Sequence, residues 1–351
     1  IYIYIYFFIM DPQRYNGTIH PQMWIKQIRS FCYLKQIITE KDILNLCIGM
    51  VDVPINNPEK IKKLNDLIEA LKSNVSFTVF KNSSQRKLNL LKYVTERDGG
   101  NTAKFVADFR SLCFDAEING LEEQKKYLFH TLPNDFFKNT FINRNMDNIK
   151  SLDDLIQMFE DIVQEESQLI RNGSCVAIKH IKTGRYLSST TKYHQTGSGK
   201  QIVFCGQMLP DSDALWFIKA SHDQLSYKDM FSLQHKVTET LIGRESHTEF
   251  IYQDYIDGDF ADHVEVYCST PSRTLQFNYH WTPQRINYTK YDSSHLRSGD
   301  IINIRNVKDN SFLRSHEYQI TIYNEKFQEV ISQDKKPEEN DEWCIELIEN
   351  H

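Results

Sequence analysis

The sequence contains no cluster of cysteine and histidine residues at the spacing that metal sites use. Its seven cysteines stand singly, without a C-x-x-C pair. We therefore expect reduced, mostly buried thiols rather than a disulfide framework. A glycine-rich phosphate loop and an H-E-x-x-H motif are also missing. The sequence predicts no metal and no cofactor.

An excess of positive charge is missing as well. The chain has 41 lysine and arginine residues against 47 aspartate and glutamate residues, for a formal net charge of −6. Non-specific affinity for nucleic acid depends on lysine and arginine contacts to phosphate. We therefore expect no nucleic-acid partner.

The chain opens on the apolar run IYIYIYFFIM, which is only ten residues long. A helix that crosses a bilayer needs about 20 apolar residues, and a signal peptide needs a basic start and a small-residue cleavage site. We predict no membrane span, an irregular segment over residues 1–19 with Met10 as the true start, and a cytoplasmic protein. Two alternatives remain: a damaged signal peptide, which would place the protein in the secretory pathway, and an edge strand.

Residues 20–170 show apolar side chains at helical spacing throughout. The periodicity predicts helices over residues 21–36, 58–72, 85–96, 101–116, 121–132, 133–141 and 151–170. The apolar stripes are interpreted as the core of a compact helical bundle rather than as binding surfaces. The first part of the chain is thus predicted to be an all-α domain, and a domain of another fold class follows it.

Four stretches of this half carry a family resemblance. They read RYNGTIHPQMWIKQI over 14–28, NTAKFVADFRSLCFDAEI over 101–118, YLFHTLPNDFF over 127–137 and SLDDLIQMFEDIV over 151–163. In this order they resemble the capsid region of retrotransposon Gag polyproteins. Tyr15 stands where that family usually has phenylalanine, while Gly17 and Trp24 keep their places. The resemblance implies a homo-oligomer that assembles through the helical domain, and no zinc knuckle follows it.

The pattern changes at Asn172-Gly173-Ser174, a turn signal that we take as the domain boundary. Beyond it, short alternating runs rich in valine, isoleucine, tyrosine and phenylalanine predict strands. We therefore expect a β domain over residues 173–351.

The β domain repeats one phrase three times. VAIKHIKTGRYLSS over 176–189, FSLQHKVTETLIGR over 231–244 and INIRNVKDNSFLRS over 302–315 begin 55 and 71 residues apart. Each copy is predicted to close on an aromatic strand, at residues 215–218, 275–278 and 342–345. Three hairpin-rich units, none of which buries its apolar face alone, predict a β-trefoil.

The first copy is specific enough to suggest a family. Gly173, His180, Thr183-Gly-x-Tyr-Leu187, Ser198-Gly-Lys-Gln-Ile-Val203 and Trp216 resemble the MIR module of protein O-mannosyltransferases, inositol-trisphosphate receptors and ryanodine receptors. The third copy matches with Asn306 in place of the histidine, and with Trp343. The second copy departs from the pattern: it lacks tryptophan at Gln276 and carries an insertion through DYIDGDF, residues 254–260.

Polar residues at the turns of these copies are the candidate ligand-binding residues. They are Lys179, His180, Lys182, Arg185, Arg244, Arg305, Lys308 and Arg314, with His316 beside them. Their donors suit a sugar hydroxyl or a phosphate, and arginine offers a rigid fork for an anion. The alternative is a solvated surface, with His180 bonding a backbone group.

Two hypotheses for function follow. The first is a non-catalytic binding protein, in which the trefoil recognises a glycan, a phosphorylated ligand or another protein and is carried on a self-assembling helical module. The second is an accessory subunit of a mannosyl-transfer or endoplasmic-reticulum quality-control system, which is implied by the resemblance to MIR modules. No catalytic constellation stands out from the surface charge, so we expect no enzyme activity.

Overall fold

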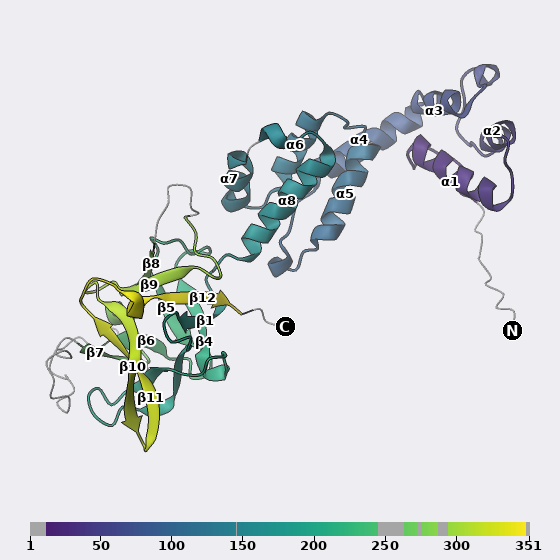
Figure 1. Ribbon diagram of the computed structural model, residues 1–351. Helices are drawn as coiled ribbons and strands as arrows, with labels where there is room; N and C mark the ends of the chain where they lie inside the picture. The colour runs from purple at the N-terminus through teal and green to yellow at the C-terminus, as the bar shows by residue number, and fades with distance from the viewer. Residues whose placement is uncertain (1–11, 145, 245–262, 272–275, 287–293, 349–351) are drawn as a thin grey trace, which may run out of the picture. The chain divides into compact units, whose positions relative to one another are not determined.

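The chain forms two compact units, residues 1–166 and 167–351, in a computed structural model that describes residues 12–144, 146–244, 263–271, 276–286 and 294–348 (Figure 1). The first unit is helical and the second is an antiparallel β-trefoil, so the predicted fold class is confirmed. The opening apolar run and the 254–260 insertion lie outside the described residues.

The described part of the first unit contains eight α-helices. They are α1 (Pro21–Leu34), α2 (Glu40–Gly49), α3 (Leu64–Lys72), α4 (Val75–Leu90), α5 (Thr102–Asp115), α6 (Leu121–Thr131), α7 (Asp135–Asn143) and α8 (Leu152–Ser167). Three predictions were wrong in detail. Helix α2 was not predicted, and the predicted start of α4 lies ten residues after the observed one. The short 3-10 helix Pro58–Lys60 was predicted as part of α3. The first turn of α4 is rich in β-branched residues, which are weak helix formers, but the Asn74 side chain caps it by accepting a hydrogen bond from the Ser76 amide at 2.9 Å.

Two groups of buried side chains hold the helical unit together. Helices α1 to α3 pack around Trp24 and Leu67. Helices α5, α7 and α8 pack around Tyr93, whose ring lies 5.1, 5.5 and 5.0 Å from the rings of Phe105, Phe137 and Phe159. These aromatic contacts have the edge-to-face geometry that stabilises ring pairs.

A polar cluster joins the two groups. The Glu117 carboxylate, just after α5, accepts hydrogen bonds from the Lys72 and Lys81 ammonium groups at 2.6 and 3.0 Å. The buried His20 ring, at the start of α1, lies 4.0 Å from the same carboxylate. Burial and then the Lys72 charge lower the pKa of His20 to about 4, although Glu117 opposes this.

Acidification should therefore destabilise the helical unit. Between pH 6.5 and about 4, the unfolded chain protonates His20 and the folded chain does not, so stability falls as the pH falls through this window. His20→Gln should flatten the decline, measured as melting temperature against pH by far-ultraviolet circular dichroism. The exposed His130→Gln variant is the control. An unchanged slope in His20→Gln would contradict the assignment.

The described part of the second unit contains four strands for each of three repeats. They are β1 (Cys175–His180), β2 (Leu187–Tyr193), β3 (Gln201–Cys205) and β4 (Leu215–Ala220); β5 (Phe231–His235), β6 (Leu241–Arg244), β7 (His263–Ser269) and β8 (Trp281–Arg285); β9 (Ile301–Asn306), β10 (Phe312–Ile322), β11 (Glu325–Gln333) and β12 (Trp343–Leu347). The first and fourth strands of the repeats pair into a closed ring, β1-β4-β5-β8-β9-β12 and back to β1. The second and third strands form three hairpins that meet through β3, β7 and β11. A six-stranded barrel capped by three hairpins is the β-trefoil fold.

A ring of three backbone hydrogen bonds lies where the repeats begin. The Ile170 amide donates to the Leu296 carbonyl at 2.9 Å, the Leu225 amide to the Ile170 carbonyl at 3.0 Å, and the Leu296 amide to the Leu225 carbonyl at 2.8 Å. All three side chains are fully buried in the trefoil core. The predicted boundary was therefore late: Ile170 belongs to the trefoil, not to the helical domain.

The three tryptophans repeat a second contact. Trp216, Trp281 and Trp343 donate from Nε1 to the carbonyls of Leu187, Ile242 and Leu313 at 2.8, 3.1 and 2.9 Å. The prediction that the second copy lacks its tryptophan was wrong. Residues 276–279 form a 3-10 helix, and the closing strand begins at Trp281. The unequal lengths of the repeats misplaced the alignment by a few residues.

The boundary can be tested by truncation. A polypeptide that begins at residue 173 lacks Ile170, whereas one that begins at residue 167 retains it. We expect the shorter polypeptide to melt roughly 10 °C lower, because it loses a buried isoleucine and leaves two hydrogen-bonding groups unpaired. Differential scanning calorimetry of both polypeptides measures this. Equal melting temperatures would show that the ring is dispensable.

Candidate functional site

The turn after the first strand of each repeat has one geometry in all three repeats. His180, His235 and Asn306 each donate their amide across the turn at 2.8 Å, to the carbonyls of Arg185, Thr240 and Ser311. The fourth residue after each has a left-handed backbone: φ is 68° at Gly184, 59° at Glu239 and 66° at Asn310. The repeats thus agree in backbone where their sequences differ.

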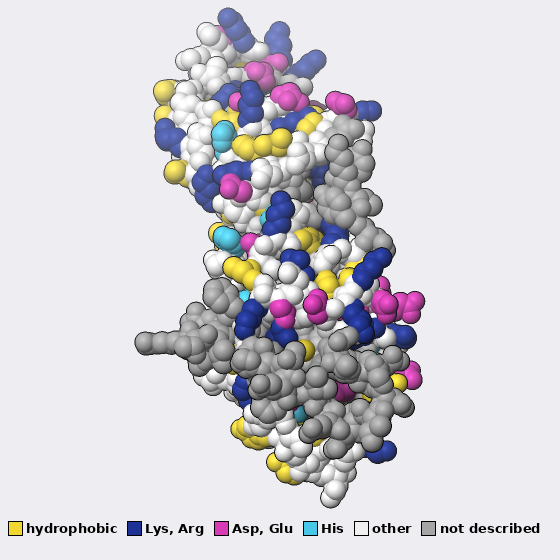
Figure 2. Space-filling view, turned by 90° about the vertical axis from the view of Figure 1, so that its left-hand side faces the viewer, with side chains coloured by type: hydrophobic (Ala, Val, Ile, Leu, Met, Phe, Trp, Pro, Cys, Tyr) yellow, Lys and Arg dark blue, Asp and Glu magenta, His cyan; other side chains and the backbone are white. Residues whose placement is uncertain are grey.

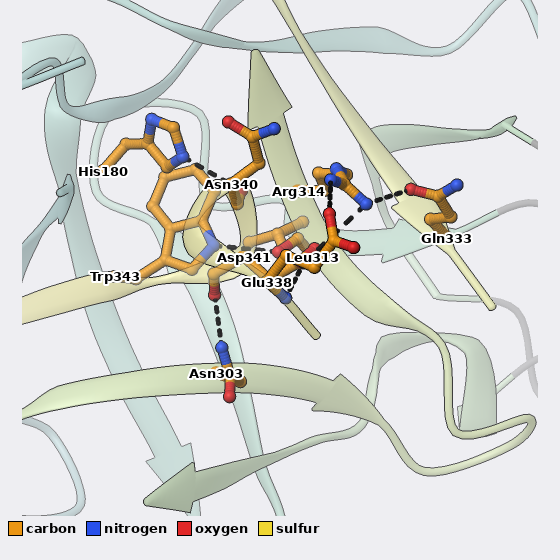
Figure 3. A network of polar contacts seen from close by, with 9 residues as sticks. All are labelled: His180, Asn303, Leu313, Arg314, Gln333, Glu338, Asn340, Asp341 and Trp343. Carbon is orange, nitrogen blue, oxygen red and sulfur yellow. Dashed lines mark hydrogen bonds and ion pairs between the residues drawn. The ribbon is translucent and has the colours of Figure 1, made fainter. Parts of the chain in front are cut away.

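The polar residue that opens each turn also binds the preceding part of the barrel. His180 lies 2.9 Å from the Thr183 hydroxyl through Nδ1 and 3.0 Å from the Asn340 carbonyl through Nε2 (Figure 3). His235 makes the same two contacts, with Thr238 and with the Asp213 carbonyl. Burial lowers the pKa of both histidines, which favours the neutral ring.

Asn306 plays this part in the third repeat, where its Nδ2 donates to the Asn278 carbonyl at 3.2 Å. The acceptors in the three repeats lie in the 3-10 helices Glu339–Asp341, Ser212–Ala214 and Gln276–Tyr279. Each turn residue therefore ties one repeat to the 3-10 helix of a neighbouring repeat. Both ring nitrogens of His180 are engaged in this way.

Arg314 lies at the centre of a polar network (Figure 3). Its guanidinium donates to the Gln333 side chain, pairs with Glu338 at 3.1 Å, and lies 3.8 Å from the carboxylate of Asp341. Asp341 is buried, which raises its pKa, and it accepts the Glu338 amide at 2.8 Å. Asn303 donates to the Asp341 carbonyl at 2.9 Å. The network holds the 3-10 helix Glu339–Asp341 in place, and His180 bonds to a carbonyl of the same helix.

Most other predicted cations also have partners within the chain. Arg185 donates to the Gly206 carbonyl at 2.7 Å, and Lys308 donates to the Asn278 side chain at 3.0 Å. Arg244, which is buried, forms an ion pair with Asp309 in the turn of the third repeat. Lys182 keeps 48% of its side chain exposed and lies 3.8 Å from Glu339.

Lys179 and Arg305 occupy the same position in their repeats, next to the last residue of the first strand. The Lys179 ammonium lies 6.0 Å from the centre of the Tyr186 ring, and Arg305 is half-buried. The structure thus divides the eight predicted residues into two groups. Lys179, His180, Lys182, Arg185 and Arg314 surround the first turn, and Arg244, Arg305 and Lys308 surround the third. Their role in binding stays a prediction.

Charges of both signs are interspersed on the described part of one face of the molecule (Figure 2). On the described part of the face in Figure 2, lysine and arginine side chains alternate with aspartate and glutamate, without a continuous basic area. All seven cysteines are free thiols, as expected, and six of them are buried. Within the described ranges, no three histidine, cysteine, aspartate or glutamate side chains gather as a metal site. None of the described helices is long and apolar enough to cross a membrane.

The sequence did not single out the exposed tyrosines of the trefoil. Tyr193, Tyr318 and Tyr323 keep about half of their surface exposed, at 51%, 53% and 55%. The sequence assigned the alternating runs to strands without stating which aromatic side chains are exposed. Tyr193 ends β2, whereas Tyr318 and Tyr323 lie on the long β10–β11 hairpin. The spacing of Ile320 and Ile322 could have indicated which face of β10 is buried.

No family model matches the chain, and no curated protein matches it. Solved structures with similarity include the SDF2-like protein from Arabidopsis thaliana, at 20% identity and a TM-score of 0.42, which covers 50% of this chain and 94% of that one. The S. cerevisiae protein O-mannosyltransferase Pmt1–Pmt2 complex bound to the sugar donor matches at 15% identity and a TM-score of 0.44, over 78% of this chain and 41% of that one. The BEL β-trefoil matches at 12% identity and a TM-score of 0.33, over 51% and 97%. Because all three scores lie below 0.5, the trefoil assignment depends on the strand pairing described above.

Arg314 and Lys182 should differ sharply in their contribution to stability. Arg314→Met leaves Asp341 buried without its cation and should lower the free energy of unfolding by about 2–4 kcal/mol. Lys182→Met removes only an exposed charge and should change it by less than about 0.5 kcal/mol. Urea unfolding followed by tryptophan fluorescence measures both variants. Equal, small effects would show that the Arg314 network is not structural.

Proposed function

We propose that the trefoil unit is a non-catalytic recognition module and that its ligand is a neutral glycan. The observation that carries the proposal is the engagement of the predicted cations by acceptors within the chain. A phosphate at Arg314 would have to displace Glu338 and Gln333, and one at Arg244 would have to displace Asp309. Breaking such a pair costs most of what the anion would contribute.

The titratable groups with shifted pKa values support a non-catalytic role. His180 and His235 bond backbone carbonyls through Nε2, and Asp341 accepts a backbone amide. A general acid or base must reach a proton of the substrate. These three groups instead hold the 3-10 helices in place, and burial is the largest cause of the shift in each of their pKa values.

The mixed surface charge favours a neutral ligand over a phosphorylated one. Lys182, the most exposed of the predicted ligand-binding residues for which an ion pair is described, has Glu339 as its neighbour. Sugar hydroxyls need paired donors and acceptors rather than a net positive field.

Three expectations stay predictions. They are self-association through the helical unit, the accessory role in mannosyl transfer or quality control, and the cytoplasmic location. A glycan ligand would suit a display of several trefoils on one assembly, since multivalency strengthens weak sites.

The ligand class can be tested on the full chain with an array of neutral oligosaccharides, sulfated oligosaccharides and inositol phosphates. We expect binding to neutral oligosaccharides that changes less than about twofold between roughly 0.05 M and 0.5 M salt, because no ion pair to the ligand is screened. Lys182→Ala should leave that binding unchanged. Binding confined to the charged ligands and lost at high salt would contradict the proposal.

A further inference from the structure

The β10–β11 hairpin breaks the threefold pattern of the trefoil. Strands β10 and β11 have 11 and 9 residues, whereas β2 and β3 have 7 and 5, and β6 and β7 have 4 and 7. The hairpin accordingly extends past the barrel in Figure 1. The extra length buries Ile320 and Ile322 against Ile202 and carries Tyr323 and Asn324 beyond these contacts.

The tip of the hairpin has a strained backbone. Tyr323 and Asn324 join the two strands with φ of 49° and 63°, so both residues lie in the left-handed region that a type I′ turn requires. Asparagine and glycine suit both positions, but a bulky tyrosine is an outlier there. Strain of this kind is retained where a side chain has a use. The strained backbone therefore indicates that the Tyr323 ring has a use.

Packing against the β2–β3 hairpin holds the long hairpin in place. Ile202 of β3 is buried against Ile320 and Ile322 of β10, and the Phe204 and Phe327 rings lie 4.8 Å apart. These contacts join the long hairpin to the β2–β3 hairpin, so its position relative to the barrel is fixed by packing.

Polar contacts then fix the tip itself. The Lys192 ammonium pairs with Glu325 and lies 5.4 Å from the centre of the Phe327 ring. The Gln195 side-chain oxygen accepts the Tyr323 amide at 3.4 Å. The tip is thus ordered before any ligand arrives, which lowers the entropic cost of binding.

A second exposed ring lies near this contact. Tyr193, the last residue of β2, and Gln195 are both exposed, and His194 between them is buried. Tyr193 lies between two residues that bond the tip, since Lys192 pairs with Glu325 and Gln195 accepts the Tyr323 amide. Exposed amide groups of Gln195 and Asn324 accompany the rings, and Lys192 and Glu325 neutralise each other.

We infer that the Tyr193 and Tyr323 rings form a platform on which a sugar ring of a neutral glycan stacks, while the Gln195 and Asn324 amides bond its hydroxyls. Tyrosine offers a large, rigid and amphipathic surface at a small cost in conformational entropy, and it suits the apolar C–H face of a sugar. The Lys192–Glu325 pair adds no net charge at the tip. The inference rests on the proposed glycan-binding function and places its site away from the eight turn residues.

Tyr323→Asn separates binding from folding. Asparagine suits the left-handed turn, so this variant of the full chain should melt at the same temperature as the parent or higher. Its affinity for the best-bound neutral oligosaccharide of the array should fall by about tenfold, the size expected for the loss of a ring contact. Isothermal titration calorimetry measures the affinity and scanning calorimetry the melting temperature. The control is Tyr33→Asn, which removes a tyrosine that is 83% exposed in the helical unit.

The outcomes distinguish the inference from the function on which it rests. A lower affinity in Tyr323→Asn and in Tyr193→Ser, with unchanged affinity in Tyr33→Asn, supports the platform. Unchanged oligosaccharide affinity in both trefoil variants overturns the platform but leaves glycan recognition standing. If the parent chain binds no neutral oligosaccharide, both the function and the platform are rejected.

Discussion

The trefoil depends on the cyclic hydrogen bonds that join Ile170, Leu225 and Leu296. Each residue lies outside the barrel strands, yet its backbone is buried and needs a partner. In a cycle of three, each amide is satisfied by the repeat before it and each carbonyl by the repeat after it. Removal of one member leaves both neighbours unpaired. The three repeats consequently depend on one another, and the trefoil begins at the end of α8 rather than at the turn signal of Asn172.

The need to pair buried backbone groups also explains why so many polar turn residues bond to other parts of the chain. A barrel of repeats has buried carbonyls in each 3-10 helix, and these need donors from a neighbouring repeat. His180, His235 and Asn306 supply them at equivalent positions, and Arg314 compensates the buried carboxylate of Asp341. Residues that look like a ligand site in the sequence are thus largely committed to joining one repeat to the next.

The sequence predicted the trefoil because its signal is repeated, and repetition survives local error. The prediction failed where a single copy had to be aligned alone. Trp281 was missed although it lies 65 residues after Trp216 and 62 before Trp343. In the helical half, α2 was missed because only Ile43, Leu44 and Cys47 mark its buried face. The exposure of Tyr323 was out of reach for a different reason: backbone conformation at a hairpin tip depends on strand register, which long-range pairing sets.

Departures from the threefold pattern are therefore more informative about function than the pattern itself. Where the repeats agree, in the tryptophans, the turn residues and the backbone ring, one physical demand accounts for all three copies. Where one repeat differs without a structural demand, the difference needs its own cause. Arg244 stands where the other repeats have Ser189 and Ser315, and its pairing with Asp309 supplies a structural cause. The long hairpin buries Ile320 and Ile322 against Ile202, but the strained tyrosine at its tip has no such cause among the described residues. A pre-organised ring held outside the barrel gains its value only from a molecule that the chain does not contain.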